Sequence, residues 1–152
     1  MIVRITDPKE KQHITRTILE ALPEWFEVEE SREKYIAESA DRILLAAKED
    51  DEYAGFLCLK ETGKDTMELA VMGVRKEYHR KGIGRALFEN AKRIAEESGY
   101  SFLQVKTVKM GMYDDYDITN RFYISCGFKE FEVINEIWGD ENPCQIYVMS
   151  LR

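Results

Sequence analysis

The segment from Val71 to Ala91 restricts the fold more than any other part of the sequence, because it predicts a strand, a basic loop with two glycines and an amphipathic helix. Gly82 and Gly84 lack β-carbons at the turn into this helix, so backbone N–H groups can approach a ligand closely there. The first N–H groups of a helix have no partner within it, and the helix dipole favours negative charge at that end. The segment therefore predicts a site for phosphate.

The charge of this segment differs from that of the whole chain. The net charge is −7, yet five of the eleven residues from 75 to 85 are basic, namely Arg75, Lys76, Arg80, Lys81 and Arg85. A local basic cluster on an acidic protein raises the local concentration of an anionic ligand. The acidic balance of the rest of the chain argues against nucleic acid as a partner, since a nucleic-acid-binding protein needs a broad basic face.

Two familiar phosphate-binding loops do not fit the sequence. A Walker loop requires Gly-Lys-Ser/Thr, but Gly84 is followed by Arg85 and Ala86. A dinucleotide-binding loop requires Gly or Ala where Leu87 stands, and an acidic residue at the end of the next strand, where residues 107–109 read Thr-Val-Lys.

The loop resembles the coenzyme A loop of the Gcn5-related N-acetyltransferases, the GNAT superfamily. The superfamily pattern is Gln/Arg-x-x-Gly-x-Gly/Ala at the start of a helix, and the sequence has His79 where Gln or Arg is usual. The resemblance implies that acetyl-CoA is the donor and that its pyrophosphate binds the loop backbone. The loop residues implied in cofactor binding are His79, Arg80, Lys81, Gly82, Ile83, Gly84 and Arg85.

A second motif, residues 119–128, resembles the superfamily pattern Ala-x-x-x-Tyr-x-x-x-Gly-Phe. The resemblance implies that the phenol of Tyr123 lies near the thioester sulfur, where it would protonate the departing thiolate. Many members have a CoA-contacting Asn seven residues earlier, at the position of Tyr116 in this chain, and Asn120 is a weaker substitute for that contact.

The order of predicted elements also matches the GNAT fold, β-α-α-β-β-β-α-β-α-β-β, an α/β (α+β) fold with a mixed central sheet of about seven strands and flanking helices. At 152 residues, we expect a single domain, residues 1–152. The expected helices are a first one capped by Asp7-Pro8 and ended by Pro23, then 31–40, 82–98 and 118–126. The expected strands are 2–5, 42–48, 53–60, 66–75, 102–108, 129–138 and 144–151.

In this superfamily the thioester lies beside the strand that precedes the glycine loop, which implies backbone contacts from Met72, Gly73 and Val74. Gly73 agrees independently, since an isolated glycine in a strand indicates a bulge or a close backbone approach. The spacing to the loop places Glu68 where the histone-acetylating branch has its general base. Ordered water or a base from elsewhere remains the alternative.

The acceptor amine is expected beside Trp25, Phe26 and Tyr113, near several acidic residues that would attract a cation. We therefore expect an N-acetyltransferase for a primary amine of a small molecule or peptide, acting by direct attack. A non-catalytic acyl-CoA-binding sensor or partner module is the alternative.

The composition predicts a cytoplasmic protein without metal or membrane contact, and we expect a monomer or a homodimer. The three cysteines have no pairing pattern, the two histidines are isolated, and no apolar run is long enough to span a bilayer.

Overall fold

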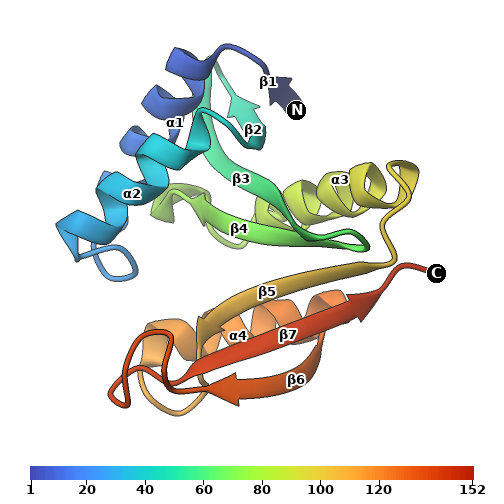
Figure 1. The fold of residues 1–152 in the computed structure, drawn as a ribbon. Coiled ribbons are helices and arrows are strands. Elements are labelled where there is room, and N and C mark those ends of the chain that lie inside the picture. Colours follow the sequence, from blue (N-terminus) through green and yellow to red (C-terminus); the bar gives the residue numbers. More distant parts are fainter. The chain divides into compact units, whose positions relative to one another are not determined.

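The computed structural model describes residues 1–152, and Figure 1 shows the arrangement of its helices and strands. The elements in chain order are β1 (Ile2–Ile5), α1 (Pro8–Glu20), α2 (Glu29–Ser39), β2 (Ile43–Glu49), β3 (Glu52–Gly63), β4 (Thr66–Val74), the 3₁₀ turn η1 (Lys76–Tyr78), α3 (Ile83–Glu97), β5 (Phe102–Val108), α4 (Asp114–Cys126), β6 (Lys129–Ile134) and β7 (Cys144–Ser150). The predicted order of helices and strands is confirmed.

The strands form one seven-stranded mixed sheet in the order β1-β2-β3-β4-β5-β7-β6. β4 and β5 run parallel, as expected for a strand–helix–strand unit that includes α3. Their ladder joins residues 66–69 to residues 102–105, the first half of each strand. β1 with β2, β2 with β3, β5 with β7 and β6 with β7 are antiparallel pairs. The predicted α/β fold class is therefore confirmed.

The chain divides into two compact units, which are described separately. The first unit contains residues 1–60 and 70–94, and the second contains residues 61–69 and 95–152.

The core of the first unit forms where α1 packs on the strands. Asp7 caps α1 and Pro8 occupies its first turn, where the missing N–H costs no hydrogen bond. Ile14, Ile18 and Leu22 recur at helical spacing and are buried against inward-facing strand residues such as Phe56. β2 and β3 are joined by a tight turn, in which Asp50 and Asp51 have positive φ.

The core of the second unit lies between α4 and the antiparallel strands β5, β7 and β6 (Figure 1). Tyr147 of β7 is completely buried, and its hydroxyl donates to Asn120 Oδ1 of α4 at 2.6 Å. Tyr123 and Phe128 pack at the other end of this helix with ring centroids 5.8 Å apart. These contacts fix α4 to the strands of its own unit.

Several element bounds differ by a few residues from the sequence expectation, and three differences are informative. The turn η1 was not predicted, because three residues give too short a pattern for a helical period. α4 begins at Asp114, four residues before the expected start, with acidic residues in its first turn that suit the positive end of the helix dipole. β6 ends at Ile134 because the chain turns there, with the amide of Gly139 donating to the carbonyl of Asn135 at 2.8 Å.

No helix combines the length and the apolar character needed to cross a membrane.

Candidate active site

The segment between β4 and α3 is an exposed loop that enters the helix at Ile83. Arg80 and Gly82 have φ values of 63° and 79°, both in the left-handed region. Residues other than glycine seldom have a left-handed backbone, so Arg80 has an unfavourable backbone conformation. Such conformations are found most often at ligand sites. The amide of Ala86 donates to the Gly82 carbonyl at 3.0 Å in the first turn of α3. A β-carbon at Gly82 would meet no protein atom within 4 Å, so the space beside the start of the helix is open.

The basic cluster of this loop is smaller than the sequence suggests. Arg75 donates to Glu52 at 2.9 Å, and Lys76 forms an ion pair with Glu24. Both cations therefore have carboxylate partners within the first unit. Arg80, Lys81 and Arg85 are exposed beside the start of α3, where Arg85 Nη1 lies 4.0 Å from Glu89 Oε1.

The end of β4 is packed closely against the first unit. Gly73 is buried, and a β-carbon there would lie 3.1 Å from Ile18 Cγ2 and 3.0 Å from Leu22 Cδ1. The side chains of α1 and of the residues after it therefore account for a glycine at this position, and the backbone contact with the cofactor stays a prediction. Met72 and Val74 are half-buried on either side.

The loop and the end of the strand are joined by His79. Its Nε2 lies 2.7 Å from the carbonyl oxygen of Val74. A carbonyl only accepts hydrogen bonds, so Nε2 is the protonated nitrogen that donates. The imidazole is therefore held against the strand end, although it remains exposed to solvent.

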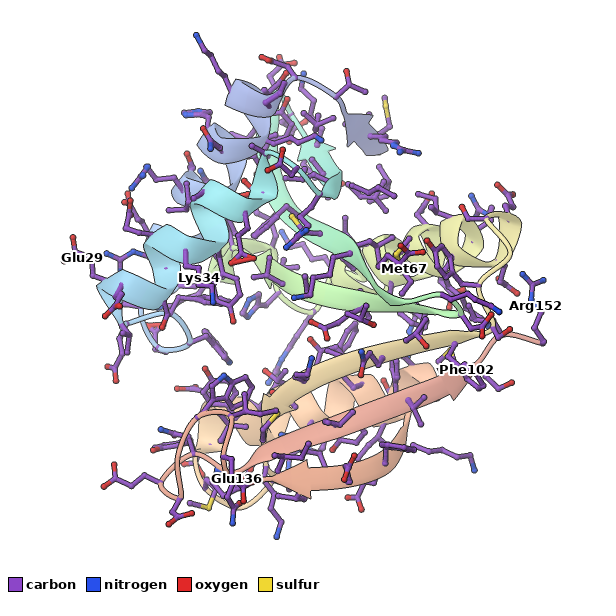
Figure 2. All side chains as sticks on the ribbon, in the orientation of Figure 1. Glu29, Lys34, Met67, Phe102, Glu136 and Arg152 are labelled. Carbon is purple, nitrogen blue, oxygen red and sulfur yellow. The ribbon has the colours of Figure 1, made fainter.

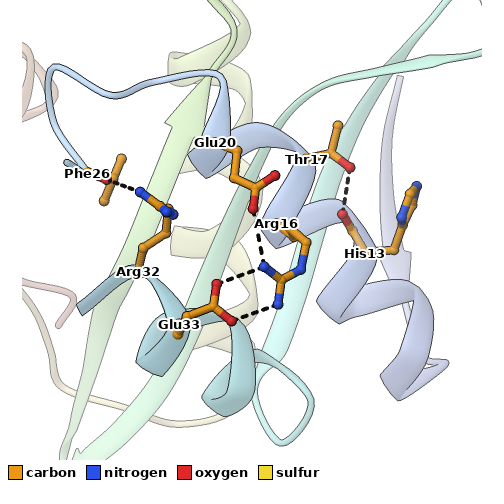
Figure 3. Close-up of polar contacts among 7 residues, drawn as sticks. All are labelled: His13, Arg16, Thr17, Glu20, Phe26, Arg32 and Glu33. Atoms are coloured by element: carbon orange, nitrogen blue, oxygen red, sulfur yellow. Dashed lines mark hydrogen bonds and ion pairs between the residues drawn. The ribbon is translucent and has the colours of Figure 1, made fainter. Parts of the chain in front are cut away.

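Trp25 and Phe26 lie in the connection between α1 and α2 and are both half-buried. The Trp25 ring meets the His79 ring edge-on, with centroids 6.1 Å apart and an interplanar angle of 73°. Phe26 packs edge-on against Tyr35, and its carbonyl accepts from Arg32 Nη1 at 3.1 Å (Figure 3). The first unit therefore brings one predicted acceptor residue, Trp25, directly against one predicted donor residue, His79.

An ion pair between the first two helices supports this connection. The guanidinium of Arg16 donates to both carboxylate oxygens of Glu33, at 2.7 and 2.8 Å, and to Glu20 at 3.2 Å (Figure 3). The hydrogen bonds from Arg16 lower the pKa of Glu33. These groups are exposed, so the contact orients α2 more than it stabilises the fold.

The acidic residues near Trp25 are mostly turned to solvent. Glu24 is paired with Lys76, whereas Glu29 points away from the strands at the start of α2 (Figure 2). Glu29 and Glu30 lie in the first turn of α2, where negative charge interacts favourably with the positive end of the helix dipole. The acidic residues at the start of α2 therefore have a structural explanation that does not involve an acceptor amine.

In the second unit, Tyr123 lies on the inner face of α4 and is 6% exposed. Its ring packs on Phe128 and on Tyr147, the latter with centroids 6.3 Å apart. α4 ends at Cys126 and is capped by Gly127, which has φ 107°, and the amide of Phe128 donates to the Tyr123 carbonyl at 3.1 Å. The Gly-Phe pair of the motif thus caps the helix and sets the position of Tyr123.

The three other α4-side residues predicted for the site have different surroundings. Asn120 is completely buried, and its Nδ2 donates to the carbonyls of Val108 at 2.8 Å and Tyr116 at 2.7 Å. Both amide hydrogens are therefore used inside the unit, which gives Asn120 a structural role in place of the cofactor contact expected from sequence. Tyr116 is half-buried, and Tyr113 is 47% exposed with its ring 6.1 Å from that of Tyr116.

Glu68 is buried in the second unit, and sequence reasoning missed its partner, Lys106. Lys106 Nζ donates to Glu68 Oε1 at 2.5 Å. The parallel register pairs Glu68 with Gln104, so Lys106, two residues further along β5, has its side chain on the same face. The parallel pairing expected of a strand–helix–strand unit is the signal that could have found it.

The cysteines do not suit covalent catalysis. Burial raises the pKa of Cys58 to about 12 and that of Cys144 to about 11, so both are protonated at neutral pH. All three cysteines are free thiols, and no group of three acidic, histidine or cysteine side chains is arranged to hold a metal ion.

The sequence model described as the acetyltransferase (GNAT) family matches residues 12–128. The chain belongs to the GNAT acetyltransferase family. The matched region contains both GNAT motifs, the glycine loop before α3 and the tyrosine motif of α4. No curated protein matches the sequence.

Solved GNAT structures share the fold at low sequence identity. An acetyltransferase of the GNAT family from Desulfovibrio desulfuricans is 22% identical, with a TM-score of 0.85 over 100% of this chain and 99% of that one. The ribosomal-protein-S18-alanine N-acetyltransferase from Escherichia coli is 16% identical, with a TM-score of 0.77 over 99% and 94%. An aminoglycoside 6'-N-acetyltransferase complexed with coenzyme A is 18% identical, with a TM-score of 0.76 over 100% and 97%. The GNAT fold therefore extends over the whole chain.

Proposed function

We propose that this GNAT protein is an N-acetyltransferase that transfers an acetyl group from acetyl-CoA to a primary amine of a small molecule or peptide. One observation carries the proposal: an exposed basic loop, with left-handed backbone at Arg80 and Gly82, leads into the open N-terminus of α3 in an acetyltransferase-family chain. We treat residues 1–152 as one catalytic domain. The three free thiols agree with a reducing cytoplasm.

Acetyl-CoA is the acetyl donor, and it supplies an activated thioester. The backbone N–H groups from Arg80 to Arg85 would hold its pyrophosphate, since this end of α3 carries unpaired donors and the positive end of the helix dipole. The fit is supported by the open space beside Gly82 and by the exposed cations of the loop. Arg75 and Lys76 have carboxylate partners, and Arg85 Nη1 lies 4.0 Å from Glu89 Oε1. Arg80 and Lys81, with Arg85 beside them at the start of α3, are the side chains that would offset the phosphate charge.

The backbone of Met72, Gly73 and Val74 would orient the acetyl and pantetheine groups. A strand N–H aimed at the acetyl carbonyl would stabilise the oxygen charge that develops during acyl transfer. The tight packing of Gly73 against Ile18 and Leu22 supports this role, because it holds the strand end rigidly in the first unit. Rigid placement of the reacting groups would supply much of the rate.

Tyr123 would act as the general acid that protonates the thiolate of coenzyme A as it leaves. A phenol with an ordinary pKa near 10 can give a proton to a thiolate whose conjugate thiol has a pKa of about 8.5. The helix cap at Gly127 and the packing of Phe128 support the role by fixing the ring. Direct transfer to the amine is favoured because Cys58 and Cys144 are protonated and buried.

Glu68 is the proposed general base, with ordered water as the alternative. A base must remove a proton from the acceptor ammonium before the nitrogen can attack. Lys106 Nζ donates to the Glu68 carboxylate, and this ion pair also gives Glu68 a structural function. The pH dependence of kcat/KM therefore has to separate the catalytic function of Glu68 from its structural function.

The acceptor would lie beside Trp25, Phe26 and Tyr113, with Tyr116 completing the cofactor side. Trp25 and Phe26 present half-buried aromatic surface, and Tyr113 is exposed. The similar structures include enzymes whose names specify an aminoglycoside and a ribosomal-protein alanine as acceptors, so both small-molecule and peptide amines belong in a substrate test.

A thiol-release assay tests the proposed function. The purified full chain would be mixed with acetyl-CoA and a panel of aminoglycosides, polyamines and short peptides, and free coenzyme A would be measured with a thiol reagent. We expect amine-dependent thiol release that falls by about 10²-fold or more when Tyr123 is changed to Phe. Binding of acetyl-CoA without release for any amine would favour the acyl-CoA-binding module.

A further inference from the structure

The connection between α1 and α2, residues 21–28, contacts the segment that ends β4 and forms the glycine loop, residues 72–82. We call these the acceptor connection and the donor segment, and both belong to the first unit. Leu22 is the anchor of the acceptor connection: it is 3% exposed and fills the space that a side chain at Gly73 would occupy. The amides of Trp25 and Phe26 donate to the Leu22 carbonyl at 3.2 and 3.1 Å. The turn that presents both aromatic residues is therefore built on the end of β4.

A second contact joins the same two segments through charge. Glu24 of the acceptor connection pairs with Lys76 of the donor segment, and the hydrogen bond from Lys76 lowers the pKa of Glu24. Both groups are partly exposed, with side-chain exposures of 52% for Lys76 and 34% for Glu24. Such a pair adds little stability, but it restricts how far the two segments can separate.

The third contact joins the aromatic ring of Trp25 to the loop itself. His79 donates from Nε2 to the carbonyl of Val74, so its ring is tied to the strand end that is proposed to hold the acetyl donor. The Trp25 ring meets this imidazole edge-on at 6.1 Å, a geometry that aromatic rings favour. A Gln at position 79, common among GNAT proteins, could donate to the same carbonyl but would offer Trp25 no ring.

We propose that His79 and Trp25 are positioning residues that couple the donor segment to the acceptor connection, so that coenzyme A bound at the loop orders the aromatic wall of the amine site. The inference rests on the proposed function, because it takes coenzyme A as the ligand of the loop. A ligand on the N–H groups of Arg80–Arg85 restrains the backbone next to His79. His79 in turn restrains Trp25. The packing of Leu22 and the ion pair of Glu24 hold the acceptor connection against the donor segment. Binding of the donor then reduces the entropy that the acceptor would otherwise lose on binding.

Hydrogen–deuterium exchange of the full chain with and without coenzyme A tests the coupling. Peptides covering residues 80–86 report binding at the loop, and peptides covering residues 21–28 report order in the acceptor connection. In the wild-type protein we expect coenzyme A to slow exchange in both peptides. His79→Gln keeps a donor for Val74 and should leave protection of residues 80–86 in place, while protection of residues 21–28 falls by about 2–10-fold, the range for loss of one aromatic pair.

Two further variants make the result specific. Trp25→Leu removes the other ring and should produce the same loss in residues 21–28. His13→Gln changes the only other histidine, which is exposed on α1, and should behave like wild type.

The outcomes separate this inference from the proposed function. Protection of residues 21–28 that is unchanged in His79→Gln or in Trp25→Leu overturns the coupling and leaves the proposed function standing. Failure of coenzyme A to protect residues 80–86 in the wild-type protein overturns both, because the loop would then not be its binding site.

Discussion

Lys106 Nζ lies 2.5 Å from Glu68 Oε1, and the Glu68 side chain is only 7% exposed. The two residues come from the parallel strands β4 and β5 within the second unit. A carboxylate removed from water in this way depends on its partner, because an uncompensated buried charge is costly. The pair therefore makes Glu68 a stability determinant as well as the proposed base.

Changing Lys106 to Met should destabilise the fold by about 3 kcal/mol, since it leaves the Glu68 carboxylate buried without its cation. Urea unfolding followed by circular dichroism would measure the loss. The double variant Glu68→Gln/Lys106→Met should recover most of it, because no charge then remains buried. Arg16→Met is the control: it breaks the exposed ion pair with Glu33, and its effect should be much smaller. Equal effects of Lys106→Met and Arg16→Met would contradict this view of the buried pair.

The pH dependence of the rate distinguishes a base from a structural carboxylate. If Glu68 takes the proton from the acceptor ammonium, Glu68→Gln should abolish the rise of kcat/KM with pH, because the amide cannot accept that proton. The measurement is a pH profile with the best amine from the thiol-release panel. A profile of wild-type shape at reduced stability would assign Glu68 to the ion pair alone and leave water as the base.

The loop assignment can be tested by ligand-induced stabilisation. Acetyl-CoA should raise the Tm of the wild-type protein, since a ligand that binds only the native state stabilises it by mass action. Gly82→Val should abolish the shift, because φ is 79° there and a β-branched residue forces the loop to change shape. Gly99→Val is a matched control for backbone strain, since Gly99 has φ 89°, no atom within 4 Å of a β-carbon, and lies beyond the opposite end of α3. A shift that survives in Gly82→Val would contradict the assignment.

The sequence predicted the fold well because its signals were local. Asp7-Pro8 starts α1, as expected, and this helix start depends on neighbouring residues only. The start of α4 was placed too late because Asp114 and Asp115 gave no apolar period, although they suit the helix dipole. Local sequence patterns therefore predicted which helices and strands exist better than they predicted where each helix begins.

The candidate site was less predictable because its contacts join residues far apart in the chain. The glycine loop could be found from residues 79–84, but no local pattern pairs Trp25 with His79 or Glu68 with Lys106. The basic cluster was overestimated for the same reason, since the carboxylate partner of Arg75 lies 23 residues earlier in the chain. A short motif such as the glycine loop therefore identifies the cofactor side of the site. The partners of its side chains become visible only in the tertiary structure.

Thiol labelling tests the burial of the cysteines. Burial raises the pKa of Cys58 and Cys144 from 9.0 to about 12 and about 11, so at pH 8 only the less buried Cys126 should react with iodoacetamide in the native protein. In urea all three should react, which mass spectrometry would count. The raised values also predict that stability falls above pH 9, because the unfolded chain loses these protons before the native one does. Fast labelling of Cys58 in the native protein would contradict the packing of the first unit.

Tyr123→Phe separates catalysis from packing at the proposed acid. Phe keeps the ring contacts with Phe128 and Tyr147, so we expect the fold and the affinity for acetyl-CoA to stay close to wild type. Loss of the phenol should lower kcat by about 10²-fold or more, the scale of general acid catalysis. Tyr147→Phe is the matched control on the same core: it removes the 2.6 Å bond to Asn120 and should cost about 1 kcal/mol of stability with little change in kcat. If instead Tyr123→Phe weakens acetyl-CoA binding as much as it lowers the rate, the tyrosine is a structural residue and the thiolate takes its proton from another donor.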